Sequence, residues 1–258
     1  MKSVHLSRYI PNTLTCISLL FGVYAAIAGI SGNYFEAMTA IFMAAVFDFS
    51  DGLAARLLKA YSAMGKELDS LADMVSFGVA PGMILYRFLD DLLLSLSWHD
   101  SAASKLFLLT AFAVPVFSGL RLAKFNIDER QKTSFIGLPV PAHAILWSSL
   151  IVVLANDSHA VLCFFPQLAQ LLASIPPVIM LIGLSVAVVA TSLLLVSEIP
   201  MFSLKMTSFS WKSNKMTYLL IASAVLYIPF FGITGIAATI LLYIIVCLIW
   251  VGASCSSL

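Results

Sequence analysis

Apolar stretches long enough to cross a membrane make up most of the chain, and polar residues gather in the short segments between them. A helix of about 20 mostly apolar residues spans the hydrocarbon core of a bilayer, and it satisfies its own backbone hydrogen bonds there. The pattern therefore predicts an all-α fold, a polytopic membrane helix bundle of about eight transmembrane helices. The predicted spans lie near 11–30, 34–57, 67–89, 105–124, 139–155, 172–197, 216–230 and 232–251.

Two segments depart from this regular pattern. The N-terminus resembles a signal peptide, because Lys2 and Arg8 precede an apolar run and 26–28 reads Ala-Ile-Ala. The run 14–30 exceeds the ~7–15 residues of a signal-peptide core, so we expect a retained first span. Segment 160–171, which ends before two prolines, is expected to be re-entrant or interfacial.

Composition excludes a soluble domain and a disordered chain. Apolar residues make up 61% and charged residues 10% of the sequence, and the mean hydropathy is +1.01. Soluble proteins carry roughly 25% charged residues. A net charge of +1 gives no basic surface for nucleic acid. The four cysteines form no C-x-x-C pair, which argues against a disulfide or metal framework.

Lysine and arginine placement predicts the orientation. Alternate loops, counted from the N-terminus, carry 12 of the 14 Lys and Arg residues, and the other set carries Arg87 and Lys105. Because positive residues favour the cytoplasmic side, we expect both termini to be cytoplasmic. Acidic residues at 90 and 91 would then be solvated loop charges on the outer side. The cytoplasmic set is Lys2, Arg8, Arg56, Lys59, Lys66, Arg121, Lys124, Arg130, Lys132, Lys205, Lys212 and Lys215.

Four aspartates lie within one short window of the sequence. Asp48 and Asp51 are spaced i,i+3, and Asp69 and Asp73 are spaced i,i+4, so each pair shares one face of a helix. A short connection around 59–64 would bring the two helices together near the cytoplasmic surface. Four carboxylates beside lipid repel one another unless cations intervene. Oxygen ligands without His or Cys favour two divalent ions, Mg²⁺ or Mn²⁺.

Further residues of the window suit a diphosphate. Gly52 and Gly65 allow a ligand to approach the backbone closely, and Arg56 offers a planar fork for phosphate. The alternative is that the acids are solvated charges or ion-pair partners of Arg56, Lys59 and Lys66.

The window resembles the signature of the CDP-alcohol phosphotransferases, D-x2-D-G-x2-A-R-x8-G-x3-D-x3-D, at every fixed position. The resemblance implies transfer of a phosphatidyl or similar group from a CDP-linked donor to an alcohol, with release of CMP. It implies that Asp48, Asp51, Asp69 and Asp73 bind two metal ions and that Asp73 is also the catalytic base. The stretch 10–15 is similar to a family segment that approaches the nucleotide. The expected CDP-diacylglycerol contacts are Pro11, Asn12, Thr13, Leu14, Gly52, Arg56, Ser62 and Gly65.

Further stretches, at 69–81, 121–126 and 135–142, resemble the phosphatidylserine synthase branch of that family. This implies that CDP-diacylglycerol and L-serine are the substrates, and a homodimer in the cytoplasmic (inner) membrane with its active site facing the cytoplasm. The resemblance covers roughly 8–145. We therefore expect a single membrane domain, 1–258, with a catalytic core at about 8–145 and additional spans at about 160–252.

An acceptor with a carboxylate needs a cation, and Arg121 and Lys124 are candidates because they are spaced i,i+3 on the side of the acids. The positive-inside rule alone also explains them. The branch more often has arginine at the position of Lys124. Glycerol 3-phosphate or inositol stays open as the acceptor. Intramembrane acids also mark cation-coupled transporters, although the acids of a transporter usually lie at the midplane within repeats.

Overall fold

The computed structural model describes residues 9–98, 101–128, 135–155, 174–201 and 215–255. These residues are almost entirely helical, and six helices or continuous runs of two or three helical elements are long and apolar enough to cross a membrane. Two shorter apolar helices, Val140–Leu154 and Tyr218–Phe231, bring the number to eight. This confirms the all-α, multi-span prediction, whereas segment 160–171 lies outside the described residues. The elements are α2 (Tyr9–Ile30), α3 (Tyr34–Leu57), α4 (Ala63–Asp73), η1 (Met74–Val79), α5 (Ala80–Ser95), α6 (Ala102–Ala111), α7 (Ala113–Ile127), β1 (Phe135–Ile136), α8 (Val140–Leu154), α10 (Pro177–Val196), β2 (Pro200–Met201), α11 (Lys215–Phe231) and α12 (Ile233–Cys255).

Two of the spans are less regular than their hydropathy suggests. The third begins at Ala63 and contains a π-helical turn, η1, between α4 and α5. The fourth is divided at Phe112 into α6 and α7. Pro115 explains this break, because proline has no N–H to donate and its ring crowds the carbonyl four residues earlier, that of Ala111. Hydropathy reports length and apolar character, so it does not detect such local changes in winding.

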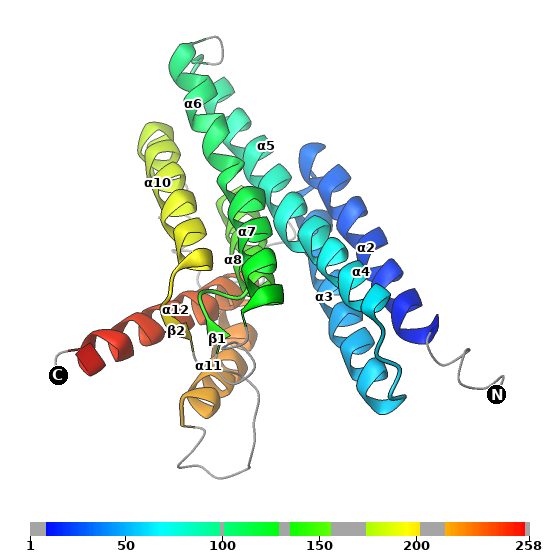
Figure 1. Ribbon diagram of the computed structural model, residues 1–258. Helices are drawn as coiled ribbons and strands as arrows, with labels where there is room; N and C mark the ends of the chain where they lie inside the picture. The colour runs from blue at the N-terminus through cyan, green and yellow to red at the C-terminus, as the bar shows by residue number, and fades with distance from the viewer. Residues whose placement is uncertain (1–8, 99–100, 129–134, 156–173, 202–214, 256–258) are drawn as a thin grey trace.

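The helices α2, α3, α5, α7, α8 and α10 run roughly side by side, as Figure 1 shows. The first helix begins, α3 ends and α4 begins at the same end of this bundle, the lower end in Figure 1. Helices α11 and α12 also lie toward this end, and α12 runs at a steep angle to α10. The structure confirms the two last predicted spans as helices but gives them a direction that hydropathy does not encode.

Small side chains let α2, α3 and η1 approach closely. Ala25, Ala37 and Ala44 are fully buried between the first two helices. A Cβ atom on Gly22 would collide with Ser76 of η1. As a result, the two helices that carry the aspartates, α3 and α4, both pack against α2.

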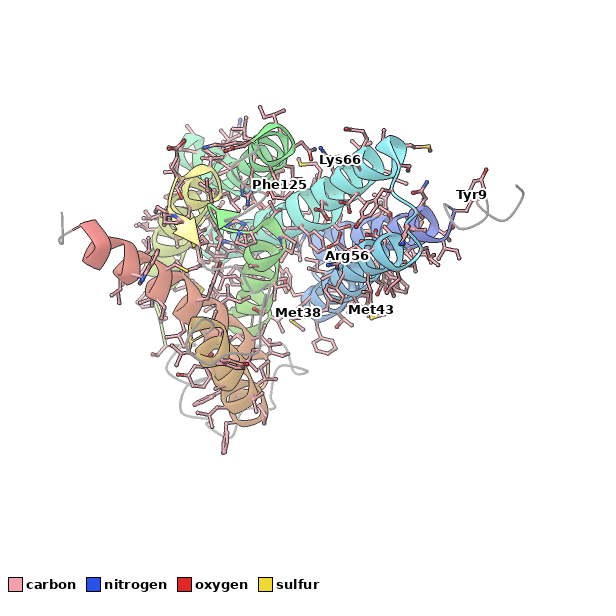
Figure 2. The ribbon with its side chains drawn as sticks, turned by 60° about the horizontal axis from the view of Figure 1, so that its bottom comes forward. Tyr9, Met38, Met43, Arg56, Lys66 and Phe125 are labelled. Carbon is pink, nitrogen blue, oxygen red and sulfur yellow. The ribbon has the colours of Figure 1, made fainter. Side chains whose placement is uncertain are left out.

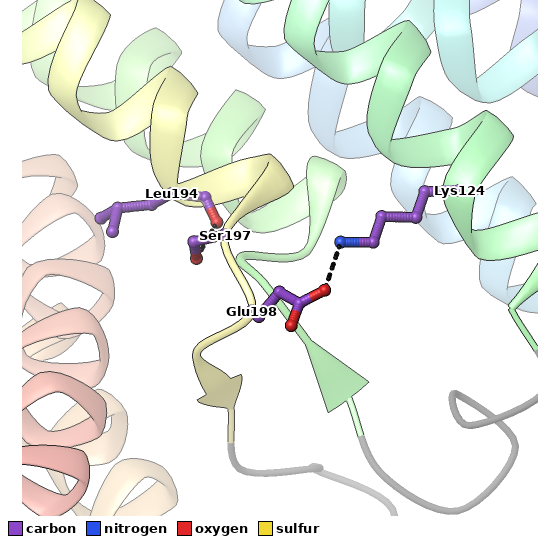
Figure 3. Close-up of polar contacts among 4 residues, drawn as sticks. All are labelled: Lys124, Leu194, Ser197 and Glu198. Carbon is purple, nitrogen blue, oxygen red and sulfur yellow. Dashed lines mark hydrogen bonds and ion pairs between the residues drawn. The ribbon is translucent and has the colours of Figure 1, made fainter.

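A two-residue β-ladder joins the chain before α8 to the chain after α10. Phe135 pairs with Met201 in an antiparallel register. Gly137 follows β1 with φ +77°, and its N–H donates to the carbonyl of Ile199 at 2.9 Å. Nearby, Lys124 Nζ lies 3.4 Å from Glu198 Oε1, as Figure 3 shows. Strands of two residues are too short for an alternating pattern, which is why the sequence did not predict them.

The opposite end of the bundle has an ion pair of its own. Arg87 Nη2 lies 2.8 Å from Asp91 Oδ1, and the hydroxyl of Tyr34 donates to Asp91 Oδ2 at 2.6 Å. The expectation that Asp91 is a solvated loop charge was therefore wrong. The helix α5 continues to Ser95 and turns this carboxylate toward α3.

Candidate active site

The four aspartates come from two neighbouring helices, as their spacing predicts. Asp48 and Asp51 lie in the last turns of α3, and Asp69 and Asp73 lie in the second half of α4. One carboxylate oxygen from each of Asp48, Asp51 and Asp69 lies within 4.8 Å of the others. Asp51 is buried, and Asp48 and Asp69 are half-buried. The short connection between α3 and α4 makes this convergence possible, because it returns the chain antiparallel to itself.

Asp73 extends the cluster on one side. The carboxyl of Asp48 is close enough to those of both Asp69 and Asp73 for their charges to interact. Among the residues that the structure describes, Asp73 Oδ1 is buried and has no hydrogen-bond partner. Like charges this close are stable only with shared protons or with cations between them. The donor set consists of oxygen alone, so the cluster is consistent with a site for a hard divalent cation.

A cavity of about 210 Å³ opens beside the acids. It lies between α2, α3 and the start of α4, and Asp51 and Asp69 form its inner wall. A Cβ atom placed on Gly52 would meet no atom of the described part of the chain within 4 Å. Ligand atoms can therefore approach the α3 backbone at this point. The lining residues are Pro11, Asn12, Thr15, Asp51, Gly52, Ala55, Ala60, Tyr61, Ser62, Gly65, Lys66 and Asp69.

The first turn of α4 closes one side of the cavity. Ser62 caps this helix, and its hydroxyl accepts a hydrogen bond from the N–H of Gly65 at 2.9 Å. A Cβ on Gly65 would lie 2.9 Å from both Ser62 Oγ and Asn12 Oδ1. Glycine at 65 thus lets α4 pack tightly against α2. Lys66, which lies near α7 in Figure 2, donates from Nζ to the carbonyl of Asn126 at 3.4 Å.

The structure brings five of the eight expected donor contacts to the cavity: Pro11, Asn12, Gly52, Ser62 and Gly65. Thr13 and Leu14 do not line it. A helix advances 100° per residue, which turns these two side chains away from the face that carries Pro11 and Asn12.

Arg56 also lies outside the cavity lining. Its side chain is exposed, and Nε donates to the carbonyl of Gly52, one turn earlier in α3, at 3.0 Å. Figure 2 shows Arg56 on α3, at the same end of the bundle as Lys66. The guanidinium is therefore not among the groups that line the cavity.

Sequence reasoning missed two polar residues of the cavity, Thr15 and Lys66. The hydroxyl of Thr15 donates to Asp51 Oδ2 at 2.6 Å. The helical spacing could have indicated Thr15, because Pro11 and Thr15 are spaced i,i+4 and therefore lie on the same face of α2. Asn12 lies next to this face. Lys66 had been assigned to the charge pattern alone, and only the packing of α4 shows that it lines the cavity.

The two acceptor candidates on α7 have different surroundings. Arg121 is 4% exposed, and its guanidinium carbon lies 5.3 Å from the centroid of the Phe125 ring. Within the described part of the chain, Arg121 Nε is buried without a hydrogen-bond partner. Lys124 instead lies near the surface beside Glu198. Their i,i+3 spacing therefore does not give them a common partner.

Comparison with known proteins agrees with the acidic cluster. The family model described as CDP-alcohol phosphatidyltransferase matches residues 8–189. The chain belongs to this family. The protein is therefore an enzyme of phospholipid synthesis, and it spans the membrane several times. Family membership favours this reading over a cation-coupled transporter.

Several relatives carry the same descriptive name, CDP-diacylglycerol–serine O-phosphatidyltransferase. The relative from Bacillus subtilis is 39% identical over 134 residues, which is 52% of this chain and 70% of that protein. The relative from Helicobacter pylori strain J99 is 36% identical over 151 residues, 58% of this chain and 59% of that protein. The relative from Methanocaldococcus jannaschii is 37% identical over 146 residues, 57% of this chain and 62% of that protein. Most of these matches thus span less than two thirds of the relative.

Proposed function

We propose that this CDP-alcohol phosphatidyltransferase transfers the phosphatidyl group of CDP-diacylglycerol to L-serine, giving phosphatidylserine and CMP. The observation that carries the proposal is the convergence of Asp48, Asp51 and Asp69 beside a cavity. The names of the similar proteins from Bacillus subtilis and Helicobacter pylori support serine as the acceptor. Glycerol 3-phosphate and inositol are the competing acceptors.

The cavity is proposed to hold the CDP head while the acyl chains stay in the bilayer. Gly52 gives the diphosphate access to the α3 backbone, and Lys66 adds a positive charge to the wall. Asp48, Asp51, Asp69 and Asp73 would hold two Mg²⁺ or Mn²⁺ ions. Such ions neutralise a diphosphate and stabilise the charge that develops on the leaving phosphate.

Asp73 is proposed to be the base. Its carboxylate accepts the proton of the serine hydroxyl while the serine oxygen attacks the phosphorus that carries the diacylglycerol. The bond from this phosphorus to the CMP oxygen breaks, and CMP leaves with the electron pair. The displacement is direct and needs no covalent enzyme intermediate. The buried Oδ1 of Asp73, which has no hydrogen-bond partner among the described residues, supports this role.

Arg121 is proposed to bind the carboxylate of serine. The buried Nε of Arg121 has no hydrogen-bond partner among the described residues. Burying an N–H without an acceptor is costly, and a carboxylate that accepts its hydrogen bond compensates that cost. The neighbouring contact between Asn126 Nδ2 and Ser70 Oγ, 2.9 Å, fixes this end of α7 beside α4. Lys124, which faces Glu198, is the weaker candidate for the same role.

The decisive experiment measures CMP release by the purified protein. CDP-diacylglycerol is supplied in mixed micelles with Mn²⁺ or Mg²⁺ and with L-serine, glycerol 3-phosphate or inositol in turn. We expect release that depends on L-serine and forms phosphatidylserine. If CMP is released only with glycerol 3-phosphate or only with inositol, that alcohol is the acceptor in place of L-serine. If CMP is released with none of the three, the proposed enzyme activity is wrong. Exchange of labelled CMP into the donor without an acceptor would contradict direct displacement.

Replacing Asp73 tests the base. We expect Asp73→Asn to lower kcat by at least about 10²-fold, because a positioned base contributes roughly that much or more, and to leave donor binding measurable. Binding of CDP-diacylglycerol in micelles is followed separately from turnover. Retention of more than a few per cent of the activity would remove Asp73 from this role.

Replacing Arg121 tests the acceptor site. We expect Arg121→Ala to raise the KM for serine by about 10-fold or more, since a lost charged hydrogen bond is worth about 1.5–3 kcal/mol, with the KM for CDP-diacylglycerol unchanged. Arg121→Lys keeps the charge but not the planar fork, and its KM should lie between the two. Equal serine KM values for all three proteins would discard the assignment.

The location of the site is also a proposal. We propose a site on the cytoplasmic side of the cytoplasmic membrane, and the distribution of Lys and Arg supports this orientation. Labelling of cysteines introduced at 96–98, after the end of α5, should occur from the outer side. Labelling from the cytoplasm alone would reverse the topology. The homodimer stays a prediction.

A further inference from the structure

One hydrogen bond connects the first helix to the acidic cluster. The hydroxyl of Thr15 on α2 donates to Asp51 Oδ2 on α3 at 2.6 Å, and the two residues are 3% and 6% exposed. The same hydroxyl lies 3.1 Å from the carbonyl of Pro11. A hydroxyl has one proton, and a hydrogen bond to a charged carboxylate is roughly twice as strong as one to a neutral carbonyl. The Thr15 hydroxyl therefore donates its proton to the hydrogen bond with Asp51.

This bond limits how the Asp51 carboxylate can turn. Asp51 contributes one of the three oxygens that lie within 4.8 Å of one another. Free rotation about its terminal bond would move both of its oxygens relative to those of Asp48 and Asp69. A donor held on one oxygen selects one orientation of the carboxylate plane. Threonine is well suited to this, because its branched Cβ restricts rotation of its own side chain.

The helix that carries Thr15 is itself fixed against both acid-bearing elements. Ser18, one turn further along α2, donates to the carbonyl of Ala44 on α3 at 2.9 Å. Ser76 of η1 donates to the carbonyl of Ser18 at 3.2 Å. These contacts set the register of α2 on α3 and on the span that contains Asp69. The position of the Thr15 hydroxyl is therefore determined by packing and not by a mobile side chain.

We propose that Thr15 is a positioning residue that holds Asp51 in the orientation needed to bind a divalent cation. The inference rests on the proposed function, because it assumes that the aspartates bind metal. Groups that orient metal ligands typically change metal affinity by 10- to 100-fold when removed. We therefore expect loss of the Thr15 hydroxyl to act mainly by raising the Kd for a divalent cation.

The test measures Mn²⁺ binding by the purified full-length protein, with free Mn²⁺ followed by electron paramagnetic resonance and no lipid substrate present. Thr15→Val keeps the shape of the side chain and removes the donor. We expect its Kd for Mn²⁺ to rise at least about 10-fold. Thr15→Ser restores the hydroxyl and should bind Mn²⁺ within about 2-fold of the natural protein. Equal affinity of the valine variant and the natural protein would overturn the proposal.

Two control variants separate positioning from general destabilisation. Ser18→Ala removes a buried hydroxyl from the same helix without touching an aspartate. It should lower the Tm and raise the Kd for Mn²⁺ less than Thr15→Val does, because the Thr15 hydroxyl is kept and Ser76 still donates to the backbone carbonyl of residue 18. Thr39→Val removes an exposed hydroxyl that donates to the carbonyl of Phe35 at 2.8 Å, and it should change neither quantity. Weakened Mn²⁺ binding by Ser18→Ala as large as that by Thr15→Val would also overturn the proposal.

The outcomes distinguish this inference from the function on which it rests. If the natural protein does not bind Mn²⁺, the metal site under the proposed function fails. If it binds Mn²⁺ and Thr15→Val binds equally well, only the role of Thr15 fails. Should the valine variant not fold, Thr15→Ala removes the same donor without the branched side chain. The same Kd criterion then decides the question.

Discussion

Replacing Gly52 by alanine separates ligand binding from protein stability. A Cβ atom at this position would meet no described residue within 4 Å, although Gly52 lies inside α3 and lines the cavity. The change therefore strains no contact among the described residues. Alanine is favoured over glycine within a helix by about 0.5–1 kcal/mol. We expect the Tm of Gly52→Ala to be equal to or above that of the natural protein.

Activity should respond in the opposite direction. If the diphosphate of the donor lies against the α3 backbone, the added methyl group occupies its place. Overpacking by one such group costs about 1–3 kcal/mol, which corresponds to roughly a 5- to 140-fold loss of affinity. We expect kcat/KM for CDP-diacylglycerol to fall within that range. The assay is CMP release at saturating serine with a varied donor concentration.

Gly183 provides a matched control. It lies inside α10 and is exposed on the surface of the bundle, and an added Cβ would have no neighbour within 4 Å among the residues that the structure describes. Gly183→Ala should have the same small effect on the Tm as Gly52→Ala and no effect on kcat/KM. Unchanged donor kinetics for Gly52→Ala would refute the reasoning, because the space beside α3 would then not be the place of the donor.

Two further predictions concern the metal ions and the far end of the bundle. Treatment with EDTA should abolish CMP release, and Mn²⁺ or Mg²⁺ should restore it, because the aspartates repel one another without cations; full activity in EDTA would contradict the metal site. Asp91→Asn removes the ion pair with Arg87. The side chains of Arg87 and Asp91 are 38% and 36% exposed, respectively. The loss should be about 1 kcal/mol, or about 2–4 °C in Tm, with kcat/KM within about 2-fold of the natural protein. A large loss of activity would show that this end of the bundle communicates with the site.

The aspartate window could be interpreted from sequence because helical spacing is a local property. Residues i,i+3 and i,i+4 share a face whatever the rest of the chain does, so Asp48 with Asp51 and Asp69 with Asp73 form pairs by necessity. The same rule, applied to α2, would have selected Thr15 in place of Thr13. The eight apolar helices were predictable for a similar reason, since span length and hydropathy are read along the chain.

Contacts between helices could not be read in this way. The hydrogen bond from Thr15 to Asp51, the exposed position of Arg56 and the burial of Arg121 depend on how far each helix is rotated about its axis. That rotation is set by packing against neighbours, for example where Gly22 meets η1. Hydropathy does not encode it in a membrane, because lipid and protein interior are almost equally apolar.

The sequence by itself determined the membrane class, the helices and the set of carboxylates that defines the family, because each follows from residue type and local spacing. Only the tertiary structure decided which residues face the cavity, that α12 runs at a steep angle to α10, and that Asp91 is paired with Arg87. Those features arise from contacts between residues far apart in the chain. Their geometry depends on the packing of many side chains at once, and no single segment contains that information.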